Sequence, residues 1–88
     1  MASGTTQMPY VKTTTYVNVA SVAVGETKTI TMETPVDASF TNPVLGKIHD
    51  PTKWYDCSIY LRGNYIYLEN TDTTAHDYKG YVDIIWFH

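Results

Sequence analysis

Three histidines, His49, His76 and His88, are the residues of this 88-residue chain best suited to metal binding or proton transfer. Two of them precede an acid directly, in His49-Asp50 and His76-Asp77. Neighbouring residues in a strand point to opposite faces, so such a pair cannot chelate one ion unless the chain turns there. A divalent site repeated about a symmetry axis is one interpretation, and solvated or turn-capping side chains are the other. The sequence predicts no metal site and no cofactor.

The residue types needed for covalent or acid–base catalysis are present but not arranged in a recognisable pattern. Cys57 alternates with Ile59 and Leu61, so we expect it to point into the core, where a cysteine behaves as a small hydrophobic residue. Glycoside hydrolysis needs two carboxyl groups about 5–9 Å apart across a cleft, and the sequence does not pair any two of its acids in that way. The chain has no glycine-rich phosphate loop, CxxC or HExxH motif. We therefore predict that the protein is not an enzyme.

Aromatic residues offer a better candidate site, on a hairpin around Gly63-Asn64. A two-residue turn there pairs Arg62 with Tyr65 and, counting outward, Cys57 with Asn70. Side chains alternate between faces, so this register separates an apolar face from a polar, tyrosine-rich one. The apolar face carries Ile59, Leu61, Ile66 and Leu68, and the other carries Ser58, Tyr60, Arg62, Tyr65, Tyr67 and Glu69.

Tyrosine and arginine are enriched at the energetic centres of protein interfaces. Tyr60, Arg62, Tyr65 and Tyr67 are therefore predicted interface residues, the alternative being a solvent-exposed face stabilised by cross-strand pairs. Trp54-Tyr55 offers a possible sugar-stacking platform, or else the buried start of a strand with Trp54 closing the end of the domain.

Composition limits the function classes. Six Lys and Arg against nine Asp and Glu give a net charge of −3, which argues against nucleic-acid binding and against a polybasic membrane surface. No apolar run approaches the roughly 20 residues that cross a bilayer. A domain this small buries too little surface to be very stable alone, and a single cysteine forms no disulfide within the chain. Association with other subunits is the remaining source of stability.

The pattern of Thr, Val, Ile and Tyr predicts an all-β fold, a small antiparallel β-sandwich or jelly roll of about six strands. We expect a flexible polar arm at residues 1–9, followed by one domain at 10–88. The predicted strands cover residues 11–21, 27–34, 44–49, 55–61, 65–70 and 80–87, and residues 71–77 form a polar loop. The last strand is apolar at nearly every position, which is typical of a strand covered on both faces. This pattern predicts that Ile84 and Trp86 contact another subunit.

Three stretches resemble small β-sandwich domains of tailed-bacteriophage virion proteins. They are Val22-Ala23-Val24-Gly25-Glu26-Thr27-Lys28-Thr29-Ile30-Thr31, the hairpin from Ile59 to Thr71, and the terminal strand from Tyr81 to Phe87. Together they span about half the chain, and residues 50–54 have no counterpart. The resemblance implies a capsid decoration, head-fibre or tail-fibre protein located in the virion, often a homotrimer that contacts other virion proteins. A carbohydrate- or host-receptor-binding module that contacts a cell-surface glycan is the alternative function.

Overall fold

The described residues form six strands and no helix, in a computed structural model. The structure describes residues 9–88, and the side chains of all of these except 50–53. The predicted arm at 1–9 therefore lies almost wholly outside the described residues. The strands are β1 (Tyr10–Val22), β2 (Thr27–Thr31), β3 (Asn42–Lys53), β4 (Cys57–Arg62), β5 (Tyr65–Asn70) and β6 (His76–Phe87).

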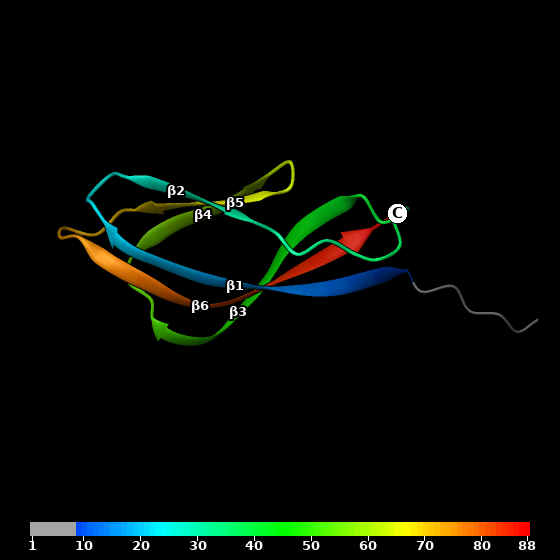
Figure 1. The fold of residues 1–88 in the computed structure, drawn as a ribbon, viewed down its shortest axis with the longest axis horizontal. Coiled ribbons are helices and arrows are strands. Elements are labelled where there is room, and N and C mark those ends of the chain that lie inside the picture. Colours follow the sequence, from blue (N-terminus) through cyan, green and yellow to red (C-terminus); the bar gives the residue numbers. More distant parts are fainter. Residues whose placement is uncertain (1–8) are drawn as a thin grey trace, which may run out of the picture.

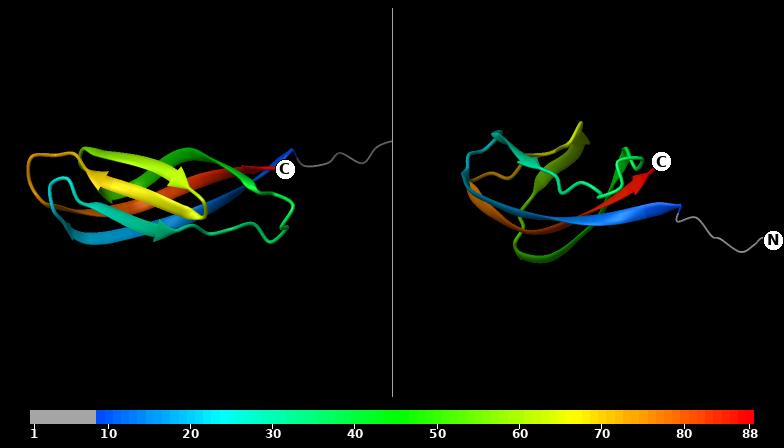
Figure 2. Two further views of the ribbon diagram at one scale, coloured as in Figure 1. Left: turned by 90° about the horizontal axis from the view of Figure 1, so that it is seen from above. Right: turned by 45° about the vertical axis from the view of Figure 1, so that its right-hand side comes forward.

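Two antiparallel three-stranded sheets face each other, which confirms the all-β sandwich. One sheet has the order β1-β6-β3 and the other the order β2-β5-β4 (Figures 1 and 2). All connections except the β4–β5 hairpin cross from one sheet to the other. Residues that are distant in the sequence therefore lie side by side, and β1 pairs with β6 from Tyr10↔Phe87 onward.

The core lies between the sheets. Its largest fully buried side chains include Tyr78, Ile66, Leu68 and Ile84, contributed by the two central strands β5 and β6. The Tyr78 hydroxyl donates to the Asp56 backbone oxygen at 2.8 Å, so this buried polar group has a partner. The two sheets thus bury one face each, as the alternating pattern of β4 and β5 predicts.

β3 and β6 are much longer than predicted, and β1 is longer by one residue at each end. β3 begins at Asn42 and continues to Lys53, through Pro43 and Pro51. Proline is tolerated because β3 is an edge strand, and the ladder to β6 shifts register twice along it. β6 begins at His76 rather than at residue 80, because pairing with the far end of β1 supplies ladder bonds that its polar start does not signal.

The far end of β1 has an irregular backbone. The register shifts between Val19 and Val22, and Ser21 has a φ of 55°, in the left-handed region that non-glycine residues rarely adopt. The Ser21 N–H donates to Asp77 Oδ1 at 2.8 Å, which stabilises this conformation. This bulge ends the regular part of β1 and turns the chain toward the second sheet.

Candidate functional site

Exposed aromatic side chains are concentrated on the outer face of the β1-β6-β3 sheet. Tyr10 pairs with Phe87 and Tyr16 with Tyr81, each pair on the side that faces away from the core. Val44, on β3, shares this side. The five side chains are 40–51% exposed, although all are large and apolar. We call Tyr10, Tyr16, Val44, Tyr81 and Phe87 the β6 face.

The aromatic pairs of the β6 face contact each other across the strands. The rings of Tyr10 and Phe87 meet edge to face at 6.1 Å, and those of Tyr16 and Tyr81 lie 5.1 Å apart. This geometry fixes the rings without covering them. Sequence reasoning missed this surface, but a signal existed: the aromatic residues are six positions apart in both strands, so antiparallel pairing places them opposite one another.

A buried carboxylate lies in the middle of the same side of the sheet. Asp83 is only 7% exposed, and its Oδ1 accepts a hydrogen bond from Thr14 Oγ1 at 2.8 Å and lies 2.9 Å from His49 Nε2. Lys12 Nζ lies 3.9 Å from Oδ2. Burial raises the pKa of Asp83, but the bonds to Thr14 and His49 and the charges of His49 and Lys12 together hold that pKa below its ordinary value.

Gly46 on β3 packs directly against the Asp83 backbone. A Cβ at position 46 would lie 2.8 Å from the Asp83 backbone oxygen and 3.2 Å from its Cβ. Only glycine fits against β6 at this point, where the β3 register shifts. The Tyr81 ring stacks on His49 at 5.8 Å, so the acid–histidine pair is continuous with the β6 face.

The predicted hairpin register is confirmed, from Arg62↔Tyr65 to Cys57↔Asn70. Tyr60, Arg62, Tyr65 and Tyr67 accordingly share the outer side of the β2-β5-β4 sheet, which we call the tyrosine face. The Tyr60 and Tyr67 rings stack at 5.3 Å, and Arg62 Cζ lies 5.9 Å from the Tyr67 ring centre. Tyr60 and Tyr65 remain 41% and 45% exposed. The two sheets therefore both carry accessible aromatic residues on their outer sides.

Ile84 and Trp86 do not lie on either outer surface. They are 0% and 2% exposed, packed between the sheets, and Trp86 Nε1 donates to Thr13 Oγ1 at 2.8 Å. The sequence pattern predicted both at a subunit contact, but the chain itself already buries them in its core. β6 is apolar because it is the central strand of its sheet, and its accessible aromatic residues are Tyr81 and Phe87.

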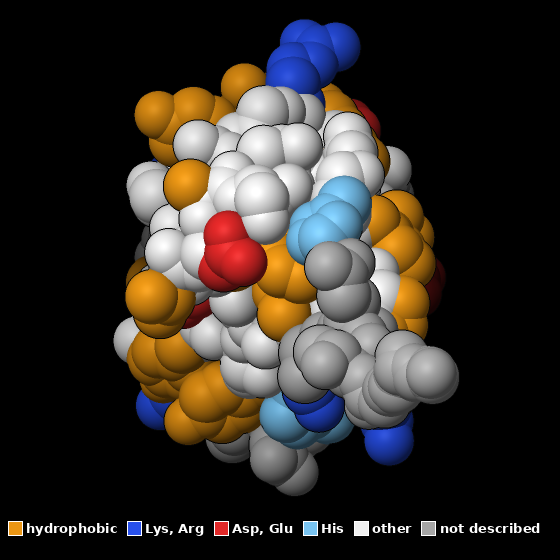
Figure 3. Space-filling model, turned by 90° about the vertical axis from the view of Figure 1, so that its right-hand side faces the viewer, with side chains coloured by type: hydrophobic (Ala, Val, Ile, Leu, Met, Phe, Trp, Pro, Cys, Tyr) orange, Lys and Arg blue, Asp and Glu red, His pale blue; other side chains and the backbone are white. Residues whose placement is uncertain are grey.

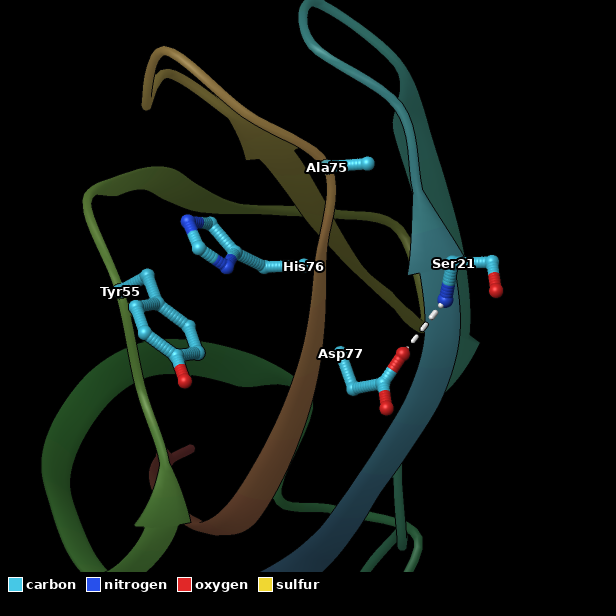
Figure 4. A pocket seen from close by; sticks show the side chains of 5 residues that line it. All are labelled: Ser21, Tyr55, Ala75, His76 and Asp77. Carbon is cyan, nitrogen blue, oxygen red and sulfur yellow. Dashed lines mark hydrogen bonds between the residues drawn. The ribbon is translucent and has the colours of Figure 1, made fainter.

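A shallow pocket of about 310 Å³ opens beside the bulge at the end of β1. Ser21, Tyr55, Ala75, His76 and Asp77 line it (Figure 4). The Tyr55 and His76 rings are parallel, with centres 3.6 Å apart, and form one wall. Asp77 points to the other side, where its Oδ1 accepts a hydrogen bond from the Ser21 N–H. Of the two residues proposed for sugar stacking, only Tyr55 lines this pocket.

Trp54 does not line the pocket and is partly buried against the core. Its ring meets Tyr78 edge-on at 5.9 Å. This packing favours the interpretation in which Trp54 closes the end of the domain. Figure 3 views the opposite end, where β1 begins, and shows hydrophobic side chains in separate groups among polar ones.

The acids and histidines meet in pairs rather than in larger groups. Asp72 Oδ2 lies 2.8 Å from His76 Nε2, and Asp83 Oδ1 lies 2.9 Å from His49 Nε2. Among the described residues, no three His, Cys, Asp or Glu side chains are placed to hold a metal ion. Cys57 lies partly buried against the core as expected, and burial raises the pKa of its thiol. No helix long and apolar enough to cross a membrane occurs in the described residues.

Comparison with protein families, with curated proteins and with solved structures finds no match to this chain.

Proposed function

We propose that this protein is a non-enzymatic structural subunit of a bacteriophage virion, a capsid decoration or fibre protein that works by protein–protein assembly. The observation that supports an assembly role is the β6 face, five large apolar side chains left 40–51% exposed on one side of a sheet. Exposed groups of this kind mark interaction sites on soluble domains. The virion context comes from the resemblance of the sequence pattern.

Association through the β6 face would remove the most apolar surface from water at its aromatic pairs. Tyr16 and Tyr81 meet near the middle of the ladder, beside the His49–Asp83 pair. Central tyrosines are frequent hot spots, and truncation of one commonly costs at least about 2 kcal/mol of binding free energy. The tyrosine face would supply a second contact, through Tyr60 and Tyr65.

The first experiment is the solution mass, by light scattering behind size exclusion at several concentrations. We expect the wild-type protein to self-associate, and Tyr81→Ser to weaken that association at least tenfold. Val24→Ser is the matched control, because it removes an exposed apolar side chain from the β1–β2 connection, outside both the β6 face and the tyrosine face. Cosedimentation with phage particles assembled without the protein tests binding to other virion proteins. A stable monomer that also fails to bind those particles would refute the proposal.

A second function, carbohydrate or receptor binding, is supported by the pocket beside the bulge. An aromatic wall formed by Tyr55 and His76, with the Asp77 carboxylate opposite, combines an apolar surface with polar groups, as small-molecule sites do. Titration with a broad glycan panel should shift the NMR signals of Tyr55 and His76 for at least one glycan. No shift with any glycan would exclude this role.

A further inference from the structure

The edge of the first sheet formed by β1 is long and almost uncharged. β1 has 13 residues, YVKTTTYVNVASV, with one charged residue, Lys12, and neither proline nor glycine. Its many Thr and Val residues favour extended, paired backbone. It is an edge strand because, among residues 9–88, its only ladder partner is β6.

The other three edges carry features that discourage pairing with another chain. β3 includes Pro43 and Pro51 and two register shifts, which remove donors and bend the strand. β2 and β4 have only five and six residues. Short edges, bulges and prolines are the usual protections against edge-to-edge association. Over residues 10–19, β1 has none of these.

Half of the backbone N–H and C=O groups of such a strand point away from its partner. Outside the strand ladders, the backbone hydrogen bonds among residues 9–88 include none from residues 10–22. The segment after β2 hydrogen-bonds to β1 side chains: Thr13 Oγ1 donates to the Glu33 oxygen and Thr15 Oγ1 accepts from the Glu33 N–H. The side chains of Thr13 and Thr15 point toward the core. These bonds therefore do not involve the backbone N–H and C=O groups of β1 that point away from β6.

We propose that β1 pairs antiparallel with β1 of a second copy about a two-fold axis, joining two sheets into one of six strands. This inference rests on the proposed function, because it names one contact by which an assembly protein would bind its own copies. A strand that pairs with itself in this way is complementary to itself by symmetry. The two β6 faces then become one continuous surface.

The register is constrained by the side chains. Residues that pair directly place their side chains on the same side of the joined sheet. For the outer sides of the two copies to coincide, each pair must join two even-numbered or two odd-numbered residues. The register shift after Val19 limits pairing to residues 10–19. A ladder centred on Thr14 pairs residues 10–18 of each copy and places Lys12 opposite Tyr16 of the second copy. It also keeps the two Lys12 ammonium groups apart, which a ladder centred on Lys12 would not.

Hydrogen exchange followed by NMR at low and high protein concentration tests this pairing. We expect a discrete dimer in which alternate amides of residues 10–18 become at least tenfold more protected as concentration rises. Contact through the β6 face alone would not protect the backbone in alternation. Asn18→Lys adds a charge on the exposed edge, next to Tyr10 and diagonal to Lys12 of the second copy. It should weaken the dimer about tenfold, since the change occurs twice.

Ser58→Lys is the matched control, an exposed polar residue on the edge strand β4 of the other sheet, and should leave the dimer unchanged. A discrete trimer, or a dimer without new protection in β1, would overturn the edge pairing and leave the proposed assembly function standing. A monomer at every concentration would also overturn it, and particle binding would then decide the proposed function separately.

Discussion

Replacement of Asn70 by alanine should destabilise the protein more than almost any other polar substitution. Asn70 ends β5 and is 0% exposed. Its Nδ2 donates to the backbone oxygens of Val22 and Thr74, at 2.8 and 2.9 Å, and its Oδ1 accepts from the Asp72 N–H at 2.8 Å. One amide thus joins the end of β1, the end of β5 and the loop before β6, in a chain that has no disulfide.

The magnitude follows from these three bonds. A typical net contribution is about 0.5–1.5 kcal/mol per hydrogen bond, and alanine also leaves buried partner groups unsatisfied. We therefore expect Asn70→Ala to lower the free energy of unfolding by about 2–4 kcal/mol. For a domain of this size that corresponds to a fall in Tm of at least about 10 °C.

Urea denaturation followed by tryptophan fluorescence measures the loss, and the m-value should not change. Asn18→Ala is the control, because Asn18 is exposed on β1 and surface substitutions usually alter stability by less than about 0.5 kcal/mol. Asn70→Asp keeps the acceptor for the Asp72 N–H but points a carboxylate at two carbonyl oxygens. The loss in the free energy of unfolding, relative to wild type at the same pH, should therefore be largest for Asn70→Asp near neutral pH, where the carboxylate is charged. A loss below about 1 kcal/mol for Asn70→Ala would refute this account of the network.

Three further predictions concern single sites. Gly46→Ala should lower the free energy of unfolding by about 1–3 kcal/mol, because the new Cβ meets the Asp83 backbone 2.8 Å away; an unchanged urea midpoint would contradict this. Asp83→Asn should destabilise the protein above the ordinary carboxyl pKa near 4. The difference in Tm from wild type should shrink as pH falls through the lower pKa of folded Asp83, and a difference independent of pH would contradict the ion pairing. Cys57 should react with a thiol reagent at neutral pH more slowly than a free cysteine peptide, because burial raises its pKa; an equal rate would show that the thiol is accessible.

The hairpin was predictable because its information is local. Gly63 has a φ of 59°, as the turn requires, and the alternation of β4 and β5 then fixes every pair from Arg62↔Tyr65 outward. A one-residue slip would move Ile66 and Leu68 out of the core, so the pattern permits one register. The fold class and the inward position of Cys57 follow from the same kind of alternation.

The long-range contacts were not predictable in this way. The β6 face requires the pairing of β1 with β6, which joins residues about 70 positions apart, and nothing local to either strand specifies that partner. Ile84 and Trp86 were assigned to a subunit contact because a doubly apolar strand has two explanations, and only the position of β6 between β1 and β3 decides between them. The alternation of β5 places Asn70 on the core side, opposite Cys57, but no local pattern predicts the partners of its amide, because they lie on other segments.

The stabilising elements of this fold are unevenly distributed, and that distribution supports assembly. The end of the sandwich near Asn70 is held by a buried polar network and by the stacked rings of Tyr55 and His76. Along the middle of β1, by contrast, the outward backbone groups have no partner among the backbone groups of residues 9–88, and Tyr16 is 45% exposed beside them. A second copy paired to this edge would satisfy those groups and cover part of the adjacent aromatic surface in the same contact. Pairing with a second copy at this edge would therefore add stability to a domain whose small size limits the surface that it can bury on its own.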